Sequence, residues 1–322
     1  MENPTRPVSE LFRAEDDFLV AAHASPDGDA IGSTVAVGFI LKVLGKRFSL
    51  YNASGVPSTL DWLPLPSPVL TELPETMPAW TIVVDCGDGA RVGSALAARL
   101  GETRVVNIDH HLGNPGFGEV DWVDVSQPAV GCMVAELARS LGVDLTGPLA
   151  EAVYLAVATD TGFFQFGNTT PECLELAADL IRGGLDAGSV SANIRNQLTL
   201  PRIQLWSEVM ATIQVHFDGA AATVRVTQEM LERTGTTPKD TEGIINFVSR
   251  LKGVRFVGIL REDGPMLVKF SLRSQGTDDV QKIAAAFGGG GHRNASGGHL
   301  RAALGAAHGK IVTAIGETLG AL

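Results

Sequence analysis

Cysteine, excess positive charge and long apolar runs are all scarce in this sequence. The 322 residues include only three cysteines (Cys86, Cys132 and Cys173), which is too few for a disulfide framework and suits a reducing compartment. Lys and Arg number 25 against 36 Asp and Glu, giving a net charge of −11. The chain therefore lacks the basic field that holds duplex DNA by counterion release, although a short anionic ligand can still bind a local site.

The sequence also contains no apolar segment of the kind that crosses or enters a membrane. No apolar run approaches the ~20 residues that span a bilayer, and the N-terminus is acidic where a signal peptide is basic and then apolar. We therefore expect a cytoplasmic protein without a membrane partner. Hydrophobic residues make up 45% of the chain and charged residues 19%, which is enough apolar material for the two domains that the length suggests.

The first half of the chain alternates short apolar runs with helical patterns. We expect strands at 18–22, 81–84 and 104–108, a helix at 31–44 and the end of another helix at 136–141. The apolar run 152–158 fits either a buried strand or a helix, since periodicity does not decide between them. Alternating strands and helices predict an α/β fold with a mostly parallel sheet covered on both faces. We interpret the proline-rich stretch 57–78 as a surface connection.

The pattern changes after residue 187. A polar helical segment at 188–209 reads as a linker, and the runs 211–215 and 222–226 flank an Asp-Gly turn that indicates a hairpin. Further strands are expected at 255–260 and 266–272. The sequence thus predicts a parallel-sheet domain at 1–187, a helical linker at 188–209 and a smaller mixed α/β domain at 210–322, with a cleft between the domains.

Histidine and aspartate gather where the apolar runs of the first half end. The first 215 residues contain three of the seven histidines, His23, His110 and His111, and all lie near aspartates. The carboxyl ends of strands in an open α/β sheet converge on one crevice. We therefore expect these histidines to meet five aspartates: Asp27, Asp29, Asp85, Asp109 and Asp160.

Such a cluster requires a compensating cation, because five neighbouring carboxylates cannot all stay ionised alone. Mixed imidazole and carboxylate ligands suit manganese or magnesium better than a thiolate zinc site. Each cluster alone has a simpler explanation as a turn, a helix N-cap or a polar strand end. Four clusters that together use every histidine of this half are an improbable coincidence, so we interpret them as one site.

Five segments carry a family resemblance. HASPDGDAIGS, VDCGD, DHHLGN and ATDTGFF resemble the four motifs of the DHH phosphoesterases, and GGGGHRNASGG resembles the signature of the DHH-associated C-terminal domain. These segments run from His23 to Gly298 and so cover nearly the whole chain. Length and layout are most similar to the branch containing oligoribonucleases (nano-RNases) and phosphatases of adenosine 3′,5′-bisphosphate (pAp).

The resemblance implies two divalent metal ions, manganese first and magnesium or cobalt as alternatives, which together activate a water molecule. Six side chains would hold them: His23 and Asp27 for one ion, Asp29, His110 and Asp160 for the other, and Asp85 for both. Asp109 would orient a histidine ligand. His111 would contact the phosphate or protonate the leaving oxygen.

The resemblance also assigns substrate contacts to the second domain. The residues implied are Arg273, Ser274, Gly290, Gly291, His292 and Asn294. Glycines allow backbone amides to approach an anion, and an arginine suits a bidentate phosphate contact. Two simpler explanations stay open: the glycine-rich segment as a flexible turn, and Arg273 as a solvated strand residue.

The function implied is manganese-dependent hydrolysis of very short oligoribonucleotides to 5′-mononucleotides, and of pAp to AMP and phosphate. Partners would be RNA of about two to five nucleotides and nucleoside 3′,5′-bisphosphate, with short single-stranded DNA as a further candidate. Duplex DNA is not expected as a partner, and a second copy of the chain, forming a homodimer, is. The alternative is a phosphodiesterase of cyclic di-AMP or its linear dinucleotide. A metal-dependent nucleotide sensor is the non-enzymatic alternative.

Overall fold

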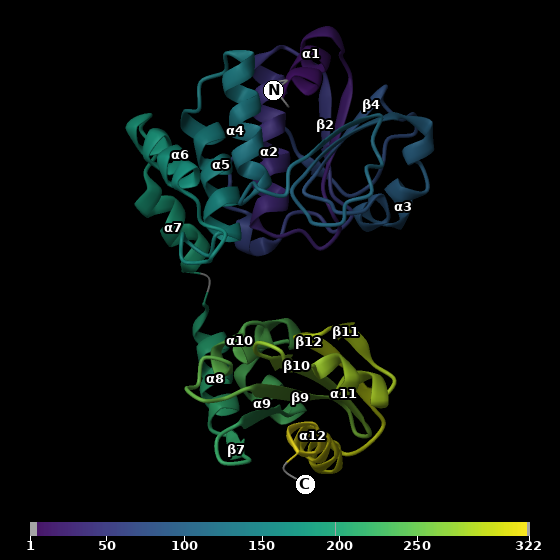
Figure 1. The fold of residues 1–322 in the computed structure, drawn as a ribbon, viewed down its shortest axis with the longest axis vertical. Coiled ribbons are helices and arrows are strands. Elements are labelled where there is room, and N and C mark those ends of the chain that lie inside the picture. Colours follow the sequence, from purple (N-terminus) through teal and green to yellow (C-terminus); the bar gives the residue numbers. More distant parts are fainter. Residues whose placement is uncertain (1–4, 197, 321–322) are drawn as a thin grey trace. The chain divides into compact units, whose positions relative to one another are not determined.

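The computed structural model describes residues 5–196 and 198–320 and divides into two compact units, one on each side of residue 197 (Figure 1). The first unit contains a six-stranded sheet in the order β3-β2-β1-β4-β5-β6, and every pairing in it is parallel. Its strands are β1 (Phe18–Ala21), β2 (Phe48–Tyr51), β3 (Val69–Leu70), β4 (Trp80–Val84), β5 (Arg104–Asp109) and β6 (Val120–Val123). The predicted parallel sheet is confirmed.

Helices cover both faces of this sheet (Figure 1). The α-helices of the unit are α1 (Arg6–Ala14), α2 (Gly28–Val43), α3 (Ser94–Ala97), α4 (Val130–Leu141), α5 (Gly147–Asp160), α6 (Pro171–Arg182) and α7 (Ala187–Arg195). The 3-10 turns are η1 (Ser58–Leu60), η2 (Gly89–Val92) and η3 (Leu100–Glu102). Phe18 and Val20 of β1 join the core formed with α2, α4 and α5, whereas Leu19 packs with Val92 and Leu96 on the other face. Burial of both faces explains why the central strands are apolar throughout.

Three local expectations are refined by the structure. Helix α2 begins at Gly28, ahead of the expected residue 31, because the Asp27 side chain accepts a hydrogen bond from the Ala30 amide and caps the helix. The ambiguous run 152–158 is helical and lies inside α5. The stretch 57–78 is more than a surface connection, since it contributes the edge strand β3 and the buried side chain of Leu60.

The order of the strands places a switch point between β1 and β4. The chain runs outward from β1 through β2 to β3, and then returns to the other side of β1 with β4. Connections that leave in opposite directions open a crevice at the carboxyl ends of the two central strands. His23 follows β1 and Asp85 follows β4, so the fold delivers both side chains to this crevice.

Helices α2, α4 and α5 approach one another unusually closely through glycine. A Cβ atom on Gly32 of α2 would lie 2.6 Å from the Ala152 carbonyl oxygen of α5, and one on Gly131 of α4 would lie 2.5 Å from the Ala156 Cβ. Backbone atoms on the facing helix cannot move aside as a flexible side chain can. This close contact fixes the ends of the three helices, which carry Asp29, Asp160 and the first amides of α4.

Replacing Gly32 by alanine should therefore destabilise the protein. We expect Gly32→Ala to lower the free energy of unfolding by about 1–3 kcal/mol, the usual cost of overpacking, measured by denaturant unfolding. The matched control is Gly309→Ala in a helix of the second unit, where an added Cβ meets nothing within 4 Å. That variant should gain about 0.5–1 kcal/mol from reduced backbone freedom. Equal midpoints for Gly32→Ala and the wild type would show that the helices separate without cost.

The second unit is a mixed sheet with helices on both faces. Its strands are β7 (Gln214–His216), β8 (Ala221–Val226), β9 (Phe256–Gly264), β10 (Leu267–Ser274), β11 (Gly290–His292) and β12 (Ala295–Leu300), in the order β11-β12-β10-β9-β8-β7. Its helices are α8 (Leu200–Met210), α9 (Gln228–Thr234), η4 (Pro238–Thr241), α10 (Ile244–Val248), α11 (Val280–Ala286) and α12 (Leu304–Leu319). Among the described strands of this unit, only β8 and β9 pair in parallel. The predicted mixed α/β unit is confirmed.

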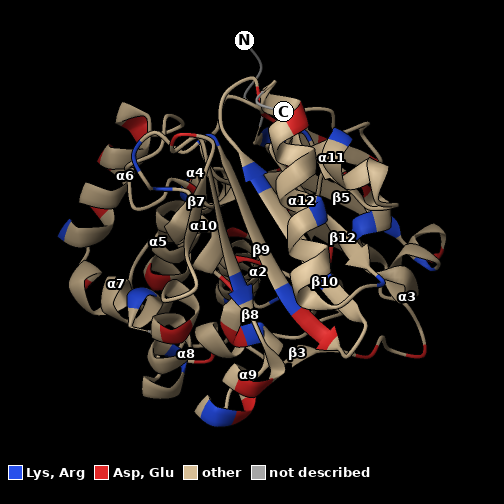
Figure 2. Ribbon diagram, turned by 90° about the horizontal axis from the view of Figure 1, so that it is seen from below, with Lys and Arg blue, Asp and Glu red and all other residues tan. Residues whose placement is uncertain are grey.

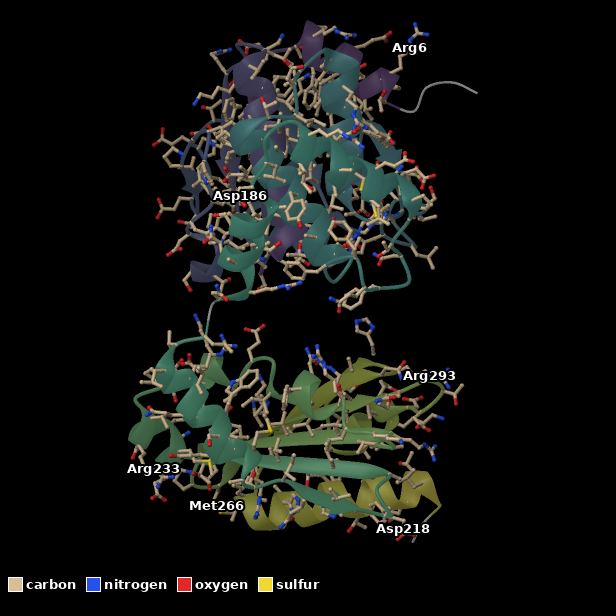
Figure 3. All side chains as sticks on the ribbon, turned by 90° about the vertical axis from the view of Figure 1, so that its left-hand side faces the viewer. Arg6, Asp186, Asp218, Arg233, Met266 and Arg293 are labelled. Atoms are coloured by element: carbon tan, nitrogen blue, oxygen red, sulfur yellow. The ribbon has the colours of Figure 1, made fainter. Side chains whose placement is uncertain are left out.

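The predicted hairpin and the predicted helical linker can both be located in the structure. The predicted hairpin joins β7 to β8 through Asp218, and Met266 lies at the turn between β9 and β10; both are labelled in Figure 3. Within the predicted linker, α7 contributes Val190 to the core of the first unit and α8 contributes Leu205 to a core of the second. The predicted domain boundaries and the cleft stay predictions.

Charged residues of both signs are distributed over both units. Lys and Arg are interspersed with Asp and Glu over the ribbon (Figure 2). Within residues 5–196 and 198–320, no helix combines the length and apolar character that a membrane crossing requires.

Candidate metal centre

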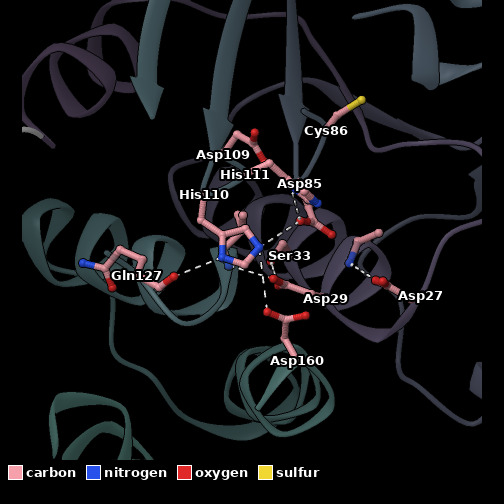
Figure 4. Close-up of polar contacts among 12 residues, drawn as sticks. Asp27, Asp29, Ser33, Asp85, Cys86, Asp109, His110, His111, Gln127 and Asp160 are labelled. Atoms are coloured by element: carbon pink, nitrogen blue, oxygen red, sulfur yellow. Dashed lines mark hydrogen bonds and ion pairs between the residues drawn. The ribbon is translucent and has the colours of Figure 1, made fainter. Parts of the chain in front are cut away.

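Asp85 lies at the middle of the site, with each carboxylate oxygen facing a different histidine. Its Oδ2 is 3.8 Å from Nε2 of His23. Its Oδ1 is 3.6 Å from Nε2 of His110 (Figure 4). The Asp85 backbone has a φ of 51° and its amide donates to the Ile108 carbonyl at 3.0 Å. A positive φ at a non-glycine residue is uncommon and is typical of functional turns. The strained turn after β4 thus aims this buried carboxylate between the two imidazoles.

Both imidazoles are held in the tautomer that a metal ligand needs. Nδ1 of His23 lies 2.9 Å from the Ala24 carbonyl oxygen, and Nδ1 of His110 lies 3.0 Å from that of Gln127. A carbonyl accepts only, so each Nδ1 must carry the hydrogen and donate it. Nε2 of each ring then faces Asp85, which is the arrangement found around metal-bound histidines.

Two further carboxylates complete the group around His110. Nε2 of His110 is 3.7 Å from Oδ2 of Asp160, the last residue of α5, and a set of ligand atoms from Asp29, His110 and Asp160 lies within 4.8 Å of one another. Asp29 accepts hydrogen bonds from the Ser33 hydroxyl at 2.8 Å and from the Val130 amide at 2.7 Å. The N-terminal amides of α4 therefore fix Asp29, since unpaired amides there favour an anion.

The group around His23 is more open. Nε2 of His23 is 4.0 Å from Oδ1 of Asp27, whose side chain is 64% exposed. His23, Asp27 and Asp85 supply one ligand atom each within 4.8 Å. Asp27 has two functions here, because the oxygen near His23 also caps α2. The simple explanation for this turn, a helix N-cap, and the metal-ligand explanation are therefore compatible.

The carboxylates of the site are destabilised as anions. Burial raises the pKa of Asp29 to about 6. Burial and the neighbouring aspartates, first Asp29, raise the pKa of Asp85 well above its ordinary value, and burial also raises the pKa of Asp160. Desolvation and like charges both disfavour ionised carboxylates, and a divalent cation reverses this penalty. With imidazole nitrogens and carboxylate oxygens as donors, the side chains present fit a divalent metal.

Asp109 and His111 form a hydrogen-bonded pair at the edge of the site, and His111 also supplies an atom to a set with Asp85 and His110 whose atoms lie within 4.8 Å of one another. Nδ1 of His111 lies 2.8 Å from Oδ1 of the fully buried Asp109, whose other oxygen accepts from the Asn114 amide group at 2.6 Å. Burial acts to raise the pKa of Asp109, but the hydrogen bonds from His111 and Asn114 outweigh it and hold that pKa below its ordinary value. The same bond to Asp109 raises the pKa of His111. Asp109 therefore orients His111, whereas His110 is oriented by Gln127.

The structure thus brings all eight predicted residues of the first unit together. Sequence reasoning did not identify Ser33, Asn114 or Gln127, which hold Asp29, Asp109 and His110 in place. Asn114 was detectable, because it ends the DHHLGN segment. Gln127 acts through its backbone carbonyl, so its side-chain type gives no signal.

In the second unit, Arg273 lies on β10 and its side chain is partly exposed. In the strand register, Lys269 of β10 is paired with Arg261 of β9 and with His299 of β12. Arg273 of β10 is paired with Ala295 of β12, and Ala295 is paired in turn with His292 of β11. Paired residues share a face of a sheet, so these basic side chains share the face opposite Phe270 and the core under α12. Arg273 helps to line a pocket of about 310 Å³ together with Lys239, Asn246, Arg261 and Lys269.

Asn294 and Ser274 stabilise the chain locally. The Asn294 amide group donates to the Ser274 hydroxyl at 3.0 Å and to the Asp278 carbonyl at 3.0 Å, and the Ser274 hydroxyl donates to that same carbonyl at 2.9 Å. These bonds tie the end of β10 to the turn before β12. The observed contacts give both side chains a structural function, and their predicted substrate contacts stay predictions.

The glycine-rich segment is also packed closely. A Cβ on Gly289 would lie 2.3 Å from the Gly297 carbonyl oxygen, and one on Gly291, where φ is 134°, would lie 2.5 Å from the Ala295 carbonyl oxygen. These glycines allow β11 and β12 to approach. Gly290 differs, because a Cβ there would meet nothing within 4 Å, and both Gly290 and His292 are exposed. Arg293, labelled in Figure 3, lies at the turn that follows.

Comparison with known proteins agrees with this arrangement. The DHH family, N-terminal domain, matches residues 17–157, and the DHHA1 domain matches residues 219–318. The bifunctional oligoribonuclease and PAP phosphatase NrnA of Thermus thermophilus is 35% identical over 98% of this chain and 94% of its own length. The chain belongs to the DHH family. As a DHH phosphoesterase it is an enzyme, which removes the nucleotide-sensor alternative.

Two further proteins extend the comparison. The NrnA of Bacillus subtilis is 28% identical over 91% of this chain and 93% of its own length. The crystal structure of an exopolyphosphatase-related protein from Bacteroides fragilis superposes with a TM-score of 0.87, at 26% identity, over 98% of this chain and 96% of that chain. The similarity therefore spans both units.

Proposed function

We propose that this DHH phosphoesterase is a manganese-dependent hydrolase of very short oligoribonucleotides, releasing 5′-mononucleotides, and that it converts pAp to AMP and phosphate. The observation that carries the proposal is the Asp85 carboxylate, whose two oxygens face His23 and His110 separately at 3.8 and 3.6 Å. A carboxylate so placed can bridge two metal ions. The similarity to proteins named oligoribonuclease and PAP phosphatase supports the choice of substrates.

The metal ions would be held by Asp85 and the five side chains around it and would supply a nucleophilic hydroxide from water at neutral pH. The chain's own residues orient the substrate and the proton. His111 is fixed by Asp109 through Nδ1, which leaves Nε2 free to hydrogen-bond the phosphate or to give a proton to the leaving oxygen. The raised pKa of His111 favours the protonated form that such a donor requires.

The second unit would bind the remainder of the substrate through its basic sheet face. The Arg273 guanidinium donates to the Leu272 carbonyl at 3.1 Å and, among the described residues, forms no ion pair. A guanidinium with free donors matches a phosphate in geometry and charge. We also place the reaction in the cytoplasm, in agreement with three buried cysteines that form no disulfide.

Loss of Arg273 should weaken substrate binding more than it slows turnover. We expect Arg273→Ala to raise KM for a diribonucleotide about 10- to 100-fold, the value of one charge-assisted contact, with a smaller change in kcat. Arg301→Ala, which removes another exposed arginine of the same unit, is the control and should match the wild type in steady-state kinetics. An unchanged KM for Arg273→Ala would leave Arg273 as a solvated strand residue.

The substrate proposal is tested by chromatography of products formed in manganese. The panel is a diribonucleotide, a pentamer, a 24-mer, cyclic di-AMP and pAp. Fast conversion of the diribonucleotide and pAp, with slow conversion of the 24-mer, is the expected result. Preference for cyclic di-AMP would assign the enzyme to second-messenger turnover, and preference for the 24-mer would contradict the proposal.

A further inference from the structure

We infer that Arg91 binds a non-bridging oxygen of the scissile phosphate beside the metal centre, an inference that rests on the phosphoester hydrolysis proposed above. Arg91 lies in η2, which follows Asp85 by a short turn. Its backbone is tied to the loop after β1, because the Ala24 amide donates to the Arg91 carbonyl at 2.7 Å. Arg91 is thus anchored between the loops that present His23 and Asp85.

The Arg91 side chain and His111 approach the same point. A Cβ placed on Gly87 would lie 3.1 Å from Cβ of His111 and 3.7 Å from Nη1 of Arg91. Gly87 separates Asp85 from η2 and has no side chain to occupy this space. The guanidinium therefore lies on the side of the site where His111 faces Asp85, whose Oδ1 is 3.7 Å from Nδ1 of His111.

Arg91 also differs from the other cations of the first unit. Within residues 5–196, the guanidinium of Arg91 has no hydrogen bond, ion pair or ring contact, and the residue is exposed. Every other Lys or Arg in this range has a partner: Arg6, Arg13, Lys42, Arg47, Lys46, Arg99, Arg104, Arg139, Arg182 and Arg195.

A firmly anchored backbone with an unpaired guanidinium suggests a ligand. The η2 turn is capped by Asp88, whose side chain accepts from the Ala90 amide at 2.8 Å, and Val92 is fully buried against Leu96. The fold thus fixes the base of the side chain and leaves five N–H donors for an external acceptor. Close to a metal centre that would bind phosphate, the acceptor with matching geometry is a phosphate oxygen.

Phosphate binding by the manganese-loaded protein tests this inference without turnover. Isothermal titration with inorganic phosphate should show a Kd at least about ten-fold weaker for Arg91→Ala, since the variant loses a charge-assisted hydrogen bond to the anion. Arg91→Lys should recover part of the affinity. Arg182→Ala, an exposed arginine of α6 that pairs with Asp179, is the control and should bind phosphate like the wild type.

Kinetics supply the second readout. Arg91→Ala should lower kcat for the diribonucleotide about 100-fold, and added guanidinium ion should restore part of the rate, which a folding defect would not show. A wild-type phosphate Kd for Arg91→Ala, or no phosphate binding by the wild type, overturns the inference. If the wild type hydrolyses no short RNA while phosphate binding is still lost in Arg91→Ala, the substrate proposal fails and the assignment of Arg91 stands.

Discussion

Replacing Asp85 by asparagine should abolish hydrolysis while leaving the fold intact. Asparagine has the same shape and tolerates a positive φ, so the turn at φ 51° should be preserved. Asparagine has one side-chain oxygen where Asp85 has two, one facing His23 and one facing His110. It also carries no negative charge to attract the metal ions. We expect kcat to fall at least 10³-fold, about 4 kcal/mol of transition-state stabilisation, in steady-state assays with the diribonucleotide.

The matched control for Asp85→Asn is Asp61→Asn, because Asp61 is an exposed aspartate of the first unit outside the candidate metal groups. It should retain wild-type kcat. Asp85→Asn should also unfold at or above the wild-type temperature in the absence of metal, since it removes a buried carboxyl group whose ionised form is disfavoured, as its strongly raised pKa indicates. Substantial activity in folded Asp85→Asn would contradict a bridging carboxylate.

Removal of divalent metal should cause the second large effect. Chelation should eliminate activity and lower Tm by about 5–10 °C relative to protein saturated with manganese, the shift expected when a ligand at ~100 times its Kd contributes ~2.7 kcal/mol. Differential scanning calorimetry with and without chelator measures the change. Manganese should restore both activity and Tm, and calcium serves as a comparison because its larger ligand shell suits this mixed imidazole site poorly.

The Tm gain from manganese should also depend on pH. Burial raises the pKa of Asp29 to about 6, so the metal-free fold holds this proton more tightly than the unfolded chain does. The free energy of unfolding of the metal-free protein therefore falls as the pH rises from 3.8, the ordinary pKa of an aspartate, to about 6, because Asp29 ionises over this range. Manganese needs the ionised form and competes with the proton below pH 6. We expect a small Tm gain at pH 5 and a large one at pH 8; an equal gain at both would argue against Asp29 as a ligand.

Sequence patterns predict the parallel sheet well because its central strands are buried on both faces. Continuous apolar runs such as Phe18–Ala21 have few alternative explanations when a polar loop and a helix follow. The same logic fails for α5, since this helix is enclosed by α2 and α4 and most of its residues are buried. With apolar residues on all sides, it lacks the amphipathic period by which a helix is identified.

The grouping of the candidate metal ligands was predictable for a different reason. Asp and His adjacent to strand ends are informative because topology brings those ends together, whatever the loops do. The residues that orient the cluster give weaker signals. Gln127 and the amides of α4 act through backbone atoms. Within residues 5–196, Arg91 is distinguished by lacking the partners that the other arginines have, a property that only the folded structure reveals.

The close packing of the glycine-rich strands limits what their motif can report. Gly289 and Gly291 are required because β11 and β12 leave no room for side chains, and Asn294 holds the neighbouring turn. Natural selection for a stable sheet would therefore preserve most of GGGGHRNASGG in a relative that had lost its substrate. Presence of this motif in a relative therefore indicates common ancestry and the same fold. A difference in activity should instead be accompanied by substitutions at Gly290, His292 or Arg273.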